Sequence, residues 1–187
     1  MRAVIDSPVG PLLVEASERG VSRIEFMGSG SNPLPQGEGR VSEEGPVLLE
    51  AARQLAGYFA GRRRVFDLPL DLGGSDFQRC VWCAIAAIPF GETASYAAVA
   101  AAAGSPTACR AAGAACGANP VAIVIPCHRV VASDGGLQGF GGGLAAKAWL
   151  LQHEATVSVR PEPVEGRSDA FVVREAHHER SPVTARP

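Results

Sequence analysis

The sequence predicts an α+β fold. We expect a small N-terminal antiparallel sheet with a helix against it, and then a mainly helical C-terminal domain with a helix-turn-helix and a short strand that leads to a candidate reactive cysteine. Two observations predict this division. Short half-apolar runs separated by turn residues fill residues 2–26, and the composition becomes helix-rich after a polar, glycine-containing joint at residues 71–76. We therefore expect domains at residues 1–72 and 73–154, followed by a tail at 155–187.

Composition excludes several classes of protein. The chain has 187 residues, 47% of them apolar, which is enough for a sizeable core. A formal net charge of −2 argues against binding nucleic acid through bulk charge, but leaves a local patch open. There is no 18-residue apolar run and no signal-peptide pattern in residues 1–26, so we expect no membrane span. Five cysteines are an odd number, which favours a reducing cytoplasm.

The N-terminal strands are predicted at residues 2–7, 12–16 and 21–26. A turn at residues 8–10 separates the first two, and Ser17-Glu18-Arg19-Gly20 is a hairpin signal between the second and third. Residues 28–45 are rich in Gly, Ser, Pro and Glu, a composition typical of a solvated loop.

A helix is predicted from Pro46 to about Ala60, because proline suits the first helical position. Its apolar stripe consists of Leu48, Ala51, Leu55, Tyr58 and Phe59. Gly61 ends this helix. Apolar residues at every second position over residues 66–70 indicate one more strand.

Helix signals dominate the next part of the chain. A Ser75 or Asp76 cap predicts a helix to residue 87, and Ser95 is placed to cap a second helix over residues 96–103. Gly104 closes that helix, and Ser105 with Pro106 is placed to begin a third, which runs to about residue 118. The second and third helices fit a helix-turn-helix, although any corner between two helices has the same pattern.

A final helix is predicted over residues 144–154, with Leu144, Lys147 or Ala148, and Leu151 on one stripe. Before it, the glycines of residues 139–143 would let the backbone approach a ligand closely, or serve as a plain hinge. Residues 155–187 have few periodic apolar residues, so we expect a largely disordered tail.

The helix over residues 107–117 consists almost entirely of small residues and carries one long cation, Arg110. Tight packing against a neighbouring helix would explain this composition. Close approach to the wall of a nucleic-acid groove would explain it equally well, and the residues alone do not separate the two interpretations.

Cys127 is the candidate nucleophile. It follows the β-branched run at residues 123–125, where we expect a strand that Pro126 ends because proline has no backbone donor. A cysteine beside apolar residues is usually a small core residue, but the neighbouring His128 and Arg129 favour a thiolate. Adjacent residues on a strand point to opposite faces, so His128 reaches Cys127 only if the backbone turns at Pro126.

The other cysteines carry weaker signals. Cys80 and Cys83 have the spacing of a metal or redox pair, but no second pair completes a zinc set, and we predict no metal. Cys109 and Cys116 lie seven residues apart and are expected to be packing residues.

The segment Pro126-Cys127-His128-Arg129 resembles the active-site motif of the O6-alkylguanine-DNA alkyltransferase family, also called the methylated-DNA–protein-cysteine methyltransferases. The resemblance covers most of residues 1–154. It includes Asn119-Pro120 before the motif, Gly142-Gly143-Leu144 and Glu154 after it, and further segments at residues 5–12, 90–93, 95–96 and 149–151.

The resemblance implies DNA repair by a single-turnover transfer of a methyl or other alkyl group from O6 of guanine, and from O4 of thymine, to the protein's own Cys127. It implies that His128 acts as a base through a water molecule, that Glu154 orients His128, and that the Tyr96 hydroxyl contacts a flipped base. A thiol with a pKa of about 8.5 is mostly protonated at neutral pH, so a paired base raises the reactive share.

The resemblance also implies a partner and the remaining roles. The partner is double-stranded DNA that contains O6-alkylguanine, approached by a monomer from the minor-groove side, with no cofactor and no metal. Arg110 would fill the gap left by the flipped base, next to DNA contacts at Ala108, Ala111 and Gly113. The residues that would line the substrate pocket are Val130, Phe140, Gly141 and Lys147. Those that would have structural roles are Asn119, Pro126 and Arg129.

Three features depart from the family pattern. Phe140 stands where many members have tyrosine, the recognition helix has little positive charge, and the tail after Glu154 has no counterpart. The low positive charge keeps a non-catalytic protein that binds alkyl lesions as an alternative, although the presence of Cys127 argues against it. A cysteine hydrolase ranks below it, because the sequence lacks an oxyanion-hole signature.

Overall fold

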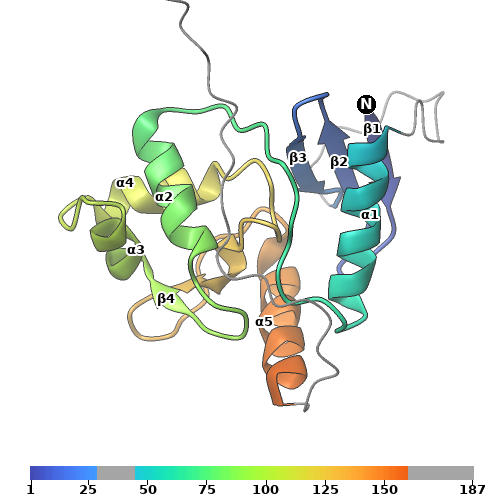
Figure 1. The fold of residues 1–187 in the computed structure, drawn as a ribbon. Helices are drawn as coiled ribbons and strands as arrows, with labels where there is room; N and C mark the ends of the chain where they lie inside the picture. The colour runs from blue at the N-terminus through green and yellow to red at the C-terminus, as the bar shows by residue number, and fades with distance from the viewer. Residues whose placement is uncertain (29–44, 160–187) are drawn as a thin grey trace, which may run out of the picture.

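The computed structural model describes residues 1–28 and 45–159. Figure 1 shows strands β1–β3 with α1 on one side of the molecule, α2, α3 and α4 on the other side, and α5 between them. The elements in chain order are β1 (Arg2–Ile5), β2 (Leu12–Ala16), β3 (Val21–Phe26), α1 (Pro46–Phe59), α2 (Asp76–Ala86), β4 (Ala94–Ser95), α3 (Tyr96–Ala102), α4 (Cys109–Gly117), the 3-10 helix η1 (Cys127–Arg129), β5 (Val130–Val131) and α5 (Gly143–Val159).

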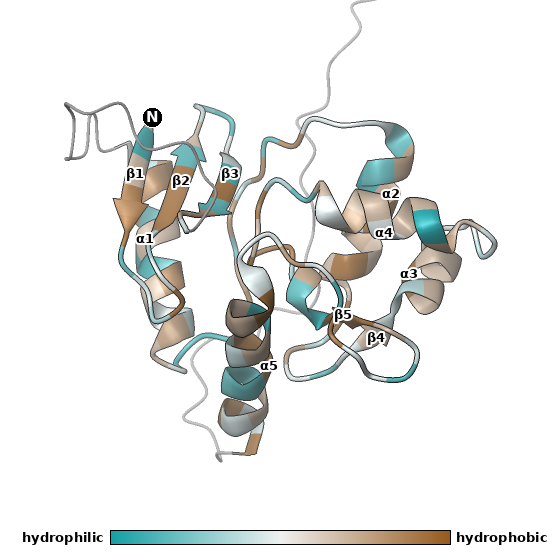
Figure 2. Ribbon diagram, turned by 180° about the vertical axis from the view of Figure 1, so that it is seen from behind, coloured by the Kyte–Doolittle hydropathy of each residue, from teal (hydrophilic) through white to brown (hydrophobic). Residues whose placement is uncertain are grey.

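The N-terminal sheet is antiparallel in the order β1-β2-β3, and its strands confirm the three predicted ones. Leu12, Val14 and Ala16 point from β2 into the core, as the alternation of a half-buried strand requires. Helix α1 covers one face of this sheet (Figure 1), and it buries Leu48, Ala51, Gln54, Leu55 and Tyr58. Figure 2 shows hydrophobic and hydrophilic residues interleaved along the three strands and α1, as elements with one buried face require.

The strand predicted over residues 66–70 is wrong, although the burial pattern behind it is right. Phe66, Leu68 and Leu70 are all buried, yet this segment forms only an isolated bridge between Val21 and Leu70. Pro69 lies inside the segment and has no N–H to donate, so a longer ladder cannot form there.

Helix caps were predicted correctly for α2 and α3. Ser75 and Gln78 form a reciprocal capping box at the start of α2, and the Ser95 side chain accepts from the Ala98 N–H at the start of α3. The predicted start of the next helix at Ser105 and Pro106 is wrong. Residues 105–108 form a turn closed by the Ala108 N–H on the Ser105 carbonyl, and α4 begins at Cys109.

The strand predicted before Cys127 is also wrong. Ile123 has a left-handed backbone with φ of 73°, and η1 begins at Cys127 itself. Hydrogen bonds within residues 121–127 replace the ladder, because the Ile125 N–H bonds to the Val121 carbonyl and the Cys127 N–H to the Ile125 carbonyl. The β-branched residues are buried in a tight loop, where local bonding overrides their strand preference.

Helix α5 runs from Gly143 to Val159, five residues beyond the predicted end, so the start of the predicted tail is helical. The predicted stripe is right at Lys147, which is buried, and wrong at Leu144, which is 48% exposed. The buried face consists of Ala146, Lys147, Leu150, Glu154 and Val157. The remainder of the predicted tail and most of the predicted loop at 28–45 lie outside the described residues.

The two halves of the chain share one continuous apolar core. Residues 120–122 pair with the exposed edge of β3: the Ile24 N–H bonds to the Pro120 carbonyl at 2.9 Å, and the Ala122 N–H bonds to the Ile24 carbonyl at 3.1 Å. The loop that carries Cys127 is thereby attached to the N-terminal sheet, while the boundary at residues 72–73 stays a prediction. Within residues 1–28 and 45–159, no helix has the length and hydrophobicity needed to cross a bilayer.

Candidate active site

Cys127 lies at the first position of η1, and its side chain opens onto a cavity of about 270 Å³. The residue itself is only 7% exposed. The Asn119 side chain fixes the preceding loop: its Oδ1 accepts from the Val121 N–H at 3.0 Å, and its Nδ2 donates to the Ile125 carbonyl at 2.8 Å. The same Nδ2 lies 3.1 Å from Cys127 Sγ and donates to it. The backbone does turn here, because the 3-10 helix η1 begins at Cys127 directly after Pro126, and direct action of His128 on Cys127 stays a prediction.

The surroundings of Cys127 favour its thiolate. A hydrogen bond from the buried Cys116 thiol lowers the pKa of Cys127 most, and this outweighs burial, which raises it. The Asn119 amide and the positive charge of Lys147 lower this pKa further. The net direction is downward, so more of the sulfur is nucleophilic at neutral pH than in a free cysteine.

Glu154, on the buried face of α5, accepts five hydrogen bonds. Its Oε1 accepts from the Tyr58 hydroxyl at 2.8 Å, from His128 Nε2 at 2.8 Å and from Arg129 Nη2 at 3.0 Å. Its Oε2 accepts from Arg129 Nε at 2.9 Å and from the Gly91 N–H at 3.0 Å. Burial alone would raise the pKa of Glu154, but the bonds from His128 and Arg129 outweigh it and hold this pKa at about 2.

These contacts determine the tautomer of His128. A carboxylate only accepts, so His128 Nε2 carries the proton that it donates to Glu154, and Nδ1 carries the lone pair. Nδ1 is buried and has no hydrogen-bond partner within the described residues. Burial lowers the pKa of His128, and Glu154 offsets this only in part, which keeps the imidazole neutral. The site therefore contains a neutral imidazole whose free nitrogen can accept a proton.

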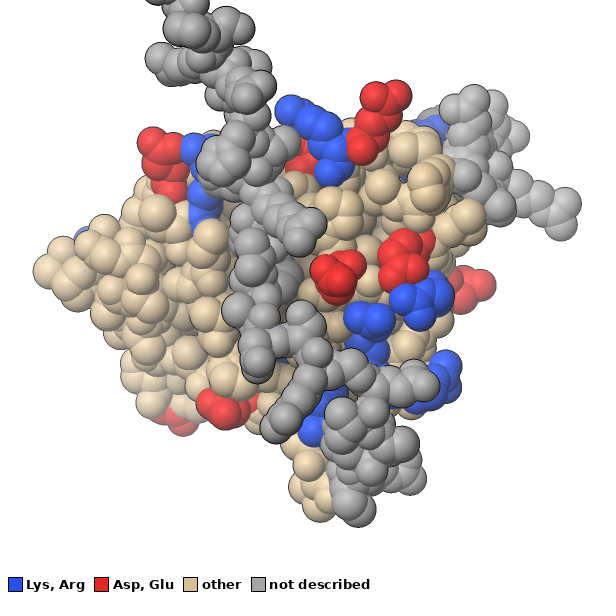
Figure 3. All heavy atoms as spheres, in the orientation of Figure 1, with Lys and Arg blue, Asp and Glu red and all other residues tan. Residues whose placement is uncertain are grey.

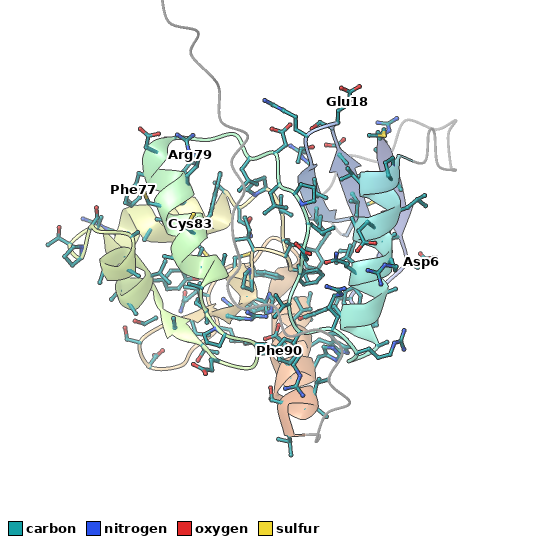
Figure 4. All side chains as sticks on the ribbon, viewed as in Figure 1. Asp6, Glu18, Phe77, Arg79, Cys83 and Phe90 are labelled. Atoms are coloured by element: carbon teal, nitrogen blue, oxygen red, sulfur yellow. The ribbon has the colours of Figure 1, made fainter. Side chains whose placement is uncertain are left out.

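Arg129 anchors this network to the rest of the fold. It forms a two-pronged ion pair with Glu154, and its Nη1 donates to the Ile88 carbonyl at 2.6 Å. Its guanidinium lies 5.6 Å from the ring centroid of Phe90, which Figure 4 labels beside α5. Asn119 and Arg129 were both predicted to have structural roles. In the structure, Asn119 donates a hydrogen bond to Cys127, and Arg129 donates to Glu154.

The cavity beside Cys127 is formed by three segments: β3, the end of α4 with the residues after it, and the glycine-rich loop before α5. Phe140 and Gly141, both predicted for the pocket, lie in its wall, and Phe140 packs edge-on against Phe26 at 5.2 Å between ring centroids. The full lining is Arg23, Ile24, Glu25, Phe26, Cys116, Gly117, Ala118, Asn119, Pro120, Ala122, Cys127, Gly139, Phe140 and Gly141.

Three other predicted pocket or substrate residues are not in this lining. Val130 is buried, and its carbonyl accepts from Lys147 Nζ at 2.6 Å. Lys147 is also buried and donates a second bond, to the Gln138 carbonyl at 3.3 Å. Tyr96 is half-buried at the start of α3, and burial raises the pKa of its hydroxyl, so it stays a hydrogen-bond donor.

The predicted DNA-binding residues lie on α4 and directly before it, and none of them bonds to Glu154 or His128. Arg110 and Ala111 are exposed on α4, and Ala108 and Gly113 are half-buried. α3 has no charged residue and α4 has only Arg110, so this side of the molecule shows few charges (Figure 3). Ala112, Ala115 and Cys116 form the opposite, buried face of α4. The buried face confirms the packing interpretation of this helix, and DNA contact through its exposed face stays a prediction.

Sequence reasoning missed two residues of the site. Tyr58 was placed only in an apolar stripe, yet a fully buried tyrosine hydroxyl needs a partner, and that requirement was the available signal. Cys116 was expected to pack, which it does, but no sequence signal places its thiol on Cys127. Cys109 is exposed, contrary to the packing role predicted for it, and Cys80 and Cys83 are exposed on α2 (Cys83 is labelled in Figure 4). Across residues 1–28 and 45–159, no group of three or more His, Cys, Asp or Glu residues could hold a metal ion.

Comparison with known proteins gives consistent matches over both halves. Two family models match the chain: the ribonuclease-like domain of 6-O-methylguanine DNA methyltransferase over residues 1–72, and the DNA binding domain over residues 76–156. A methylated-DNA–protein-cysteine methyltransferase of Methanosarcina barkeri is 43% identical over 157 residues, which are 81% of this chain and 94% of the relative. One from Mycolicibacterium paratuberculosis is 43% identical over 150 residues, 80% of this chain and 89% of the relative.

Solved structures agree with these matches. The crystal structure of O6-methylguanine methyltransferase from Mycobacterium tuberculosis has a TM-score of 0.73 at 40% identity, and covers 83% of this chain and 92% of its own. A structure of the M. tuberculosis protein in complex with DNA has the same TM-score of 0.73 and identity of 40%, over 83% of this chain and 93% of its own.

Proposed function

The chain belongs to the 6-O-methylguanine DNA methyltransferase family, and on that premise we propose that Cys127 is the sulfur that accepts the alkyl group. The protein binds DNA and repairs it by alkyl transfer to a cysteine of its own. The observation that carries the choice of Cys127 is its setting, because it opens onto a cavity while two donors stabilise its thiolate.

The transfer is a displacement at carbon. The Cys127 sulfur attacks the alkyl carbon in line, an S–C bond forms, and the bond from carbon to guanine O6 breaks with its electron pair passing to the base. His128 Nδ1 receives the thiol proton by way of a water molecule, since Nε2 is committed to Glu154. Glu154 and Arg129 hold the imidazole in this tautomer and orientation. The product is a thioether, so each molecule acts once.

The damaged base reaches this sulfur only outside the duplex, because O6 is not accessible to a buried nucleophile within the base stack. We propose that α4 approaches the minor groove with its small exposed residues and that Arg110 enters the stack in place of the flipped nucleotide. The Tyr96 hydroxyl, kept protonated by its surroundings, then donates to the flipped base. The edge-on pair of Phe26 and Phe140 gives the cavity an apolar wall for the base or its alkyl group.

We also propose that the protein works as a monomer in the cytoplasm. The residues around Glu154 and the cavity come from one chain, and the odd number of cysteines is typical of a reducing compartment.

Label transfer tests the acceptor. A duplex with a radiolabelled methyl group on guanine O6 should pass label to the protein up to one equivalent, and the label should lie in the tryptic peptide of residues 111–129. Cys127→Ala should abolish transfer, while Cys80→Ala, at an exposed thiol on α2, should keep it. Tight binding of the lesion without any transfer would select the alternative of a non-catalytic lesion-binding protein, and label on another cysteine would overturn the assignment. The same assay on O4-methylthymine tests the second substrate.

A comparison of two substrates tests the role of Arg110. Arg110→Ala should slow transfer from duplex DNA tenfold or more, the equivalent of about 1.4 kcal/mol in the barrier. It should leave the reaction with free O6-benzylguanine unchanged, because a free base needs no flipping. Equal loss with both substrates would show that Arg110 does not act on the duplex.

A further inference from the structure

Cys116 and Cys127 form a pair of thiols in the wall of one cavity. Both are 7% exposed and both line the cavity, whereas Cys80, Cys83 and Cys109 are exposed elsewhere on the surface. Cys116, on the buried face of α4, lies with its Sγ 4.0 Å from the carbonyl oxygen of Cys127. The two thiols also affect each other's pKa. The Cys116 sulfur therefore lies beside Cys127, eleven residues away in the sequence, and both residues line the same cavity.

The two thiols differ in character. The hydrogen bond between them, together with burial, raises the pKa of Cys116, while the same bond lowers that of Cys127. Cys127 is thus the more nucleophilic sulfur and reacts with an electrophile first, while Cys116 stays protonated. The repair chemistry proposed above uses only the first of them.

We propose that Cys116 is a resolving thiol, which captures Cys127 as an intramolecular disulfide when a hydroperoxide has oxidised Cys127. The Cys127 thiolate attacks the peroxide O–O bond and becomes a sulfenic acid, and the hydroxide or alkoxide leaves. The Cys116 sulfur then attacks the Cys127 sulfur, an S–S bond forms, and water leaves with the Cys116 proton. Two electrons pass from the two sulfurs to one peroxide, so the step balances without any other reactant.

The geometry supports the second step as well as the first. A peroxide is small enough for a cavity of about 270 Å³ that already holds the Cys127 sulfur in its wall. Once Cys127 is a neutral sulfenic acid, the negative charge and the hydrogen bond that held the proton on Cys116 are gone, and only burial still raises its pKa. Asn119 keeps Cys127 facing this side, through its bond to the sulfur at 3.1 Å.

The disulfide has a consequence that rests on the proposed function. It blocks the acceptor sulfur, and it also keeps that sulfur from the irreversible sulfinic and sulfonic states. A thiol reductant would restore both thiols and, with them, alkyl transfer.

Tryptic mapping of the full-length protein tests this proposal directly. Arg110 and Arg129 are successive cleavage sites, so the peptide of residues 111–129 contains Cys116 and Cys127 and no other cysteine. The peptide of residues 80–110 contains the other three cysteines, Cys80, Cys83 and Cys109. After hydrogen peroxide treatment and blocking with iodoacetamide, peptide 111–129 should be lighter than its reduced form by two hydrogen atoms and carry no block. Dithiothreitol before blocking should return two blocked thiols. The proposal would be overturned if Cys127 carried added oxygen while Cys116 was alkylated by iodoacetamide. It would also be overturned if peptide 111–129 formed a disulfide with peptide 80–110.

Variants extend the test to recovery. After excess peroxide, Cys116→Ser should accumulate the sulfinic or sulfonic acid on Cys127, which dithiothreitol does not reduce, and so should not regain alkyl transfer. Cys109→Ser, on the same helix but exposed, should form the 116–127 disulfide as the wild type does. Equal recovery of wild type and Cys116→Ser would overturn the protective role. The mass readout on the wild type needs no folded variant and no DNA, so failure of alkyl transfer itself would be seen separately, in the label-transfer assay.

Discussion

At the scale of single residues, the site is organised by one buried carboxylate rather than by the thiol. An isolated buried charge is costly, and Glu154 is stable there only because five hydrogen bonds, from four residues in three segments of the chain, converge on it. The donors leave His128 one possible tautomer, in which Nδ1 has no partner among residues 1–28 and 45–159. Cys127 lies outside this network, and separate donors, Cys116 and Asn119, stabilise its thiolate.

The depressed pKa of His128 predicts a pH dependence of stability. Burial is the main cause of the depression, so the unfolded chain binds a proton near the ordinary pKa of 6.5 while the folded chain does not. The stability from this group is therefore complete above pH 6.5 and is lost as the pH falls below it, by up to about 1.4 kcal/mol per pH unit. Urea unfolding measures the free energy of unfolding at about pH 7.5 and at about pH 5.5. The decrease in this free energy between the two pH values should be smaller for His128→Asn than for the wild type. Equal decreases would mean that His128 titrates normally in the folded protein.

At the scale of elements, side-chain caps decide where some helices begin and tertiary contacts decide the rest. Helix α2 begins at a capping box that can be read from Ser75 and Gln78. Helix α4 begins at Cys109 without any side-chain cap, after a turn in which Ser105 takes part only through its backbone. The similar sequence signals at Ser75 and Ser105 thus have different structural outcomes.

This difference predicts unequal effects of the same substitution. Ser75→Ala removes a hydrogen bond to the Gln78 N–H and should lower the free energy of unfolding by about 1 kcal/mol. Ser105→Ala should change it by less than about 0.5 kcal/mol, because no hydrogen bond of its side chain occurs in the described part of the chain. Urea titrations of both variants measure the two values. If Ser105→Ala instead lowers the free energy of unfolding as much as Ser75→Ala does, then Ser105 caps α4 and the helix begins earlier than Cys109.

At the scale of the whole molecule, the N-terminal half supports the chemistry of the C-terminal half. The edge of β3 pairs with residues 120–122, and Tyr58 of α1 donates its hydroxyl to Glu154 while its carbonyl accepts from His153 Nε2 at 2.9 Å. On the cavity side, Phe26 of β3 packs against Phe140 of the glycine-rich loop. The position of that loop, and with it the cavity, therefore depends on the N-terminal sheet.

Two neighbouring glycines of this loop test that dependence. A Cβ at Gly142 would lie 2.6 Å from the ring of Phe26, whereas a Cβ at Gly141 would meet nothing within 4 Å. Gly142→Ala should therefore lower the free energy of unfolding by about 1–3 kcal/mol through overpacking against the sheet. Gly141→Ala should stay within about 0.5 kcal/mol of the wild type. Thermal or urea unfolding measures both, and equal stability of the two variants would show that the loop does not rest on β3.

The sequence by itself determined the features that depend on nearest neighbours. The three strands of the sheet, the extent of α1, the caps of α2 and α3, and the adjacent Cys127, His128 and Arg129 are all coded within a few residues, so local chemistry was enough to predict them. Tertiary structure decided what depends on contacts between distant segments. The start of the run before Cys127 pairs with Ile24 of β3, which the sequence near Cys127 does not indicate. Helix α5 buries Lys147 and Glu154 in place of Leu144 because their charges have partners on other segments. Cys116 and Tyr58 joined the site for the same reason: packing of α4 and α1 brings each beside a group that is 11 or 96 residues away in the chain.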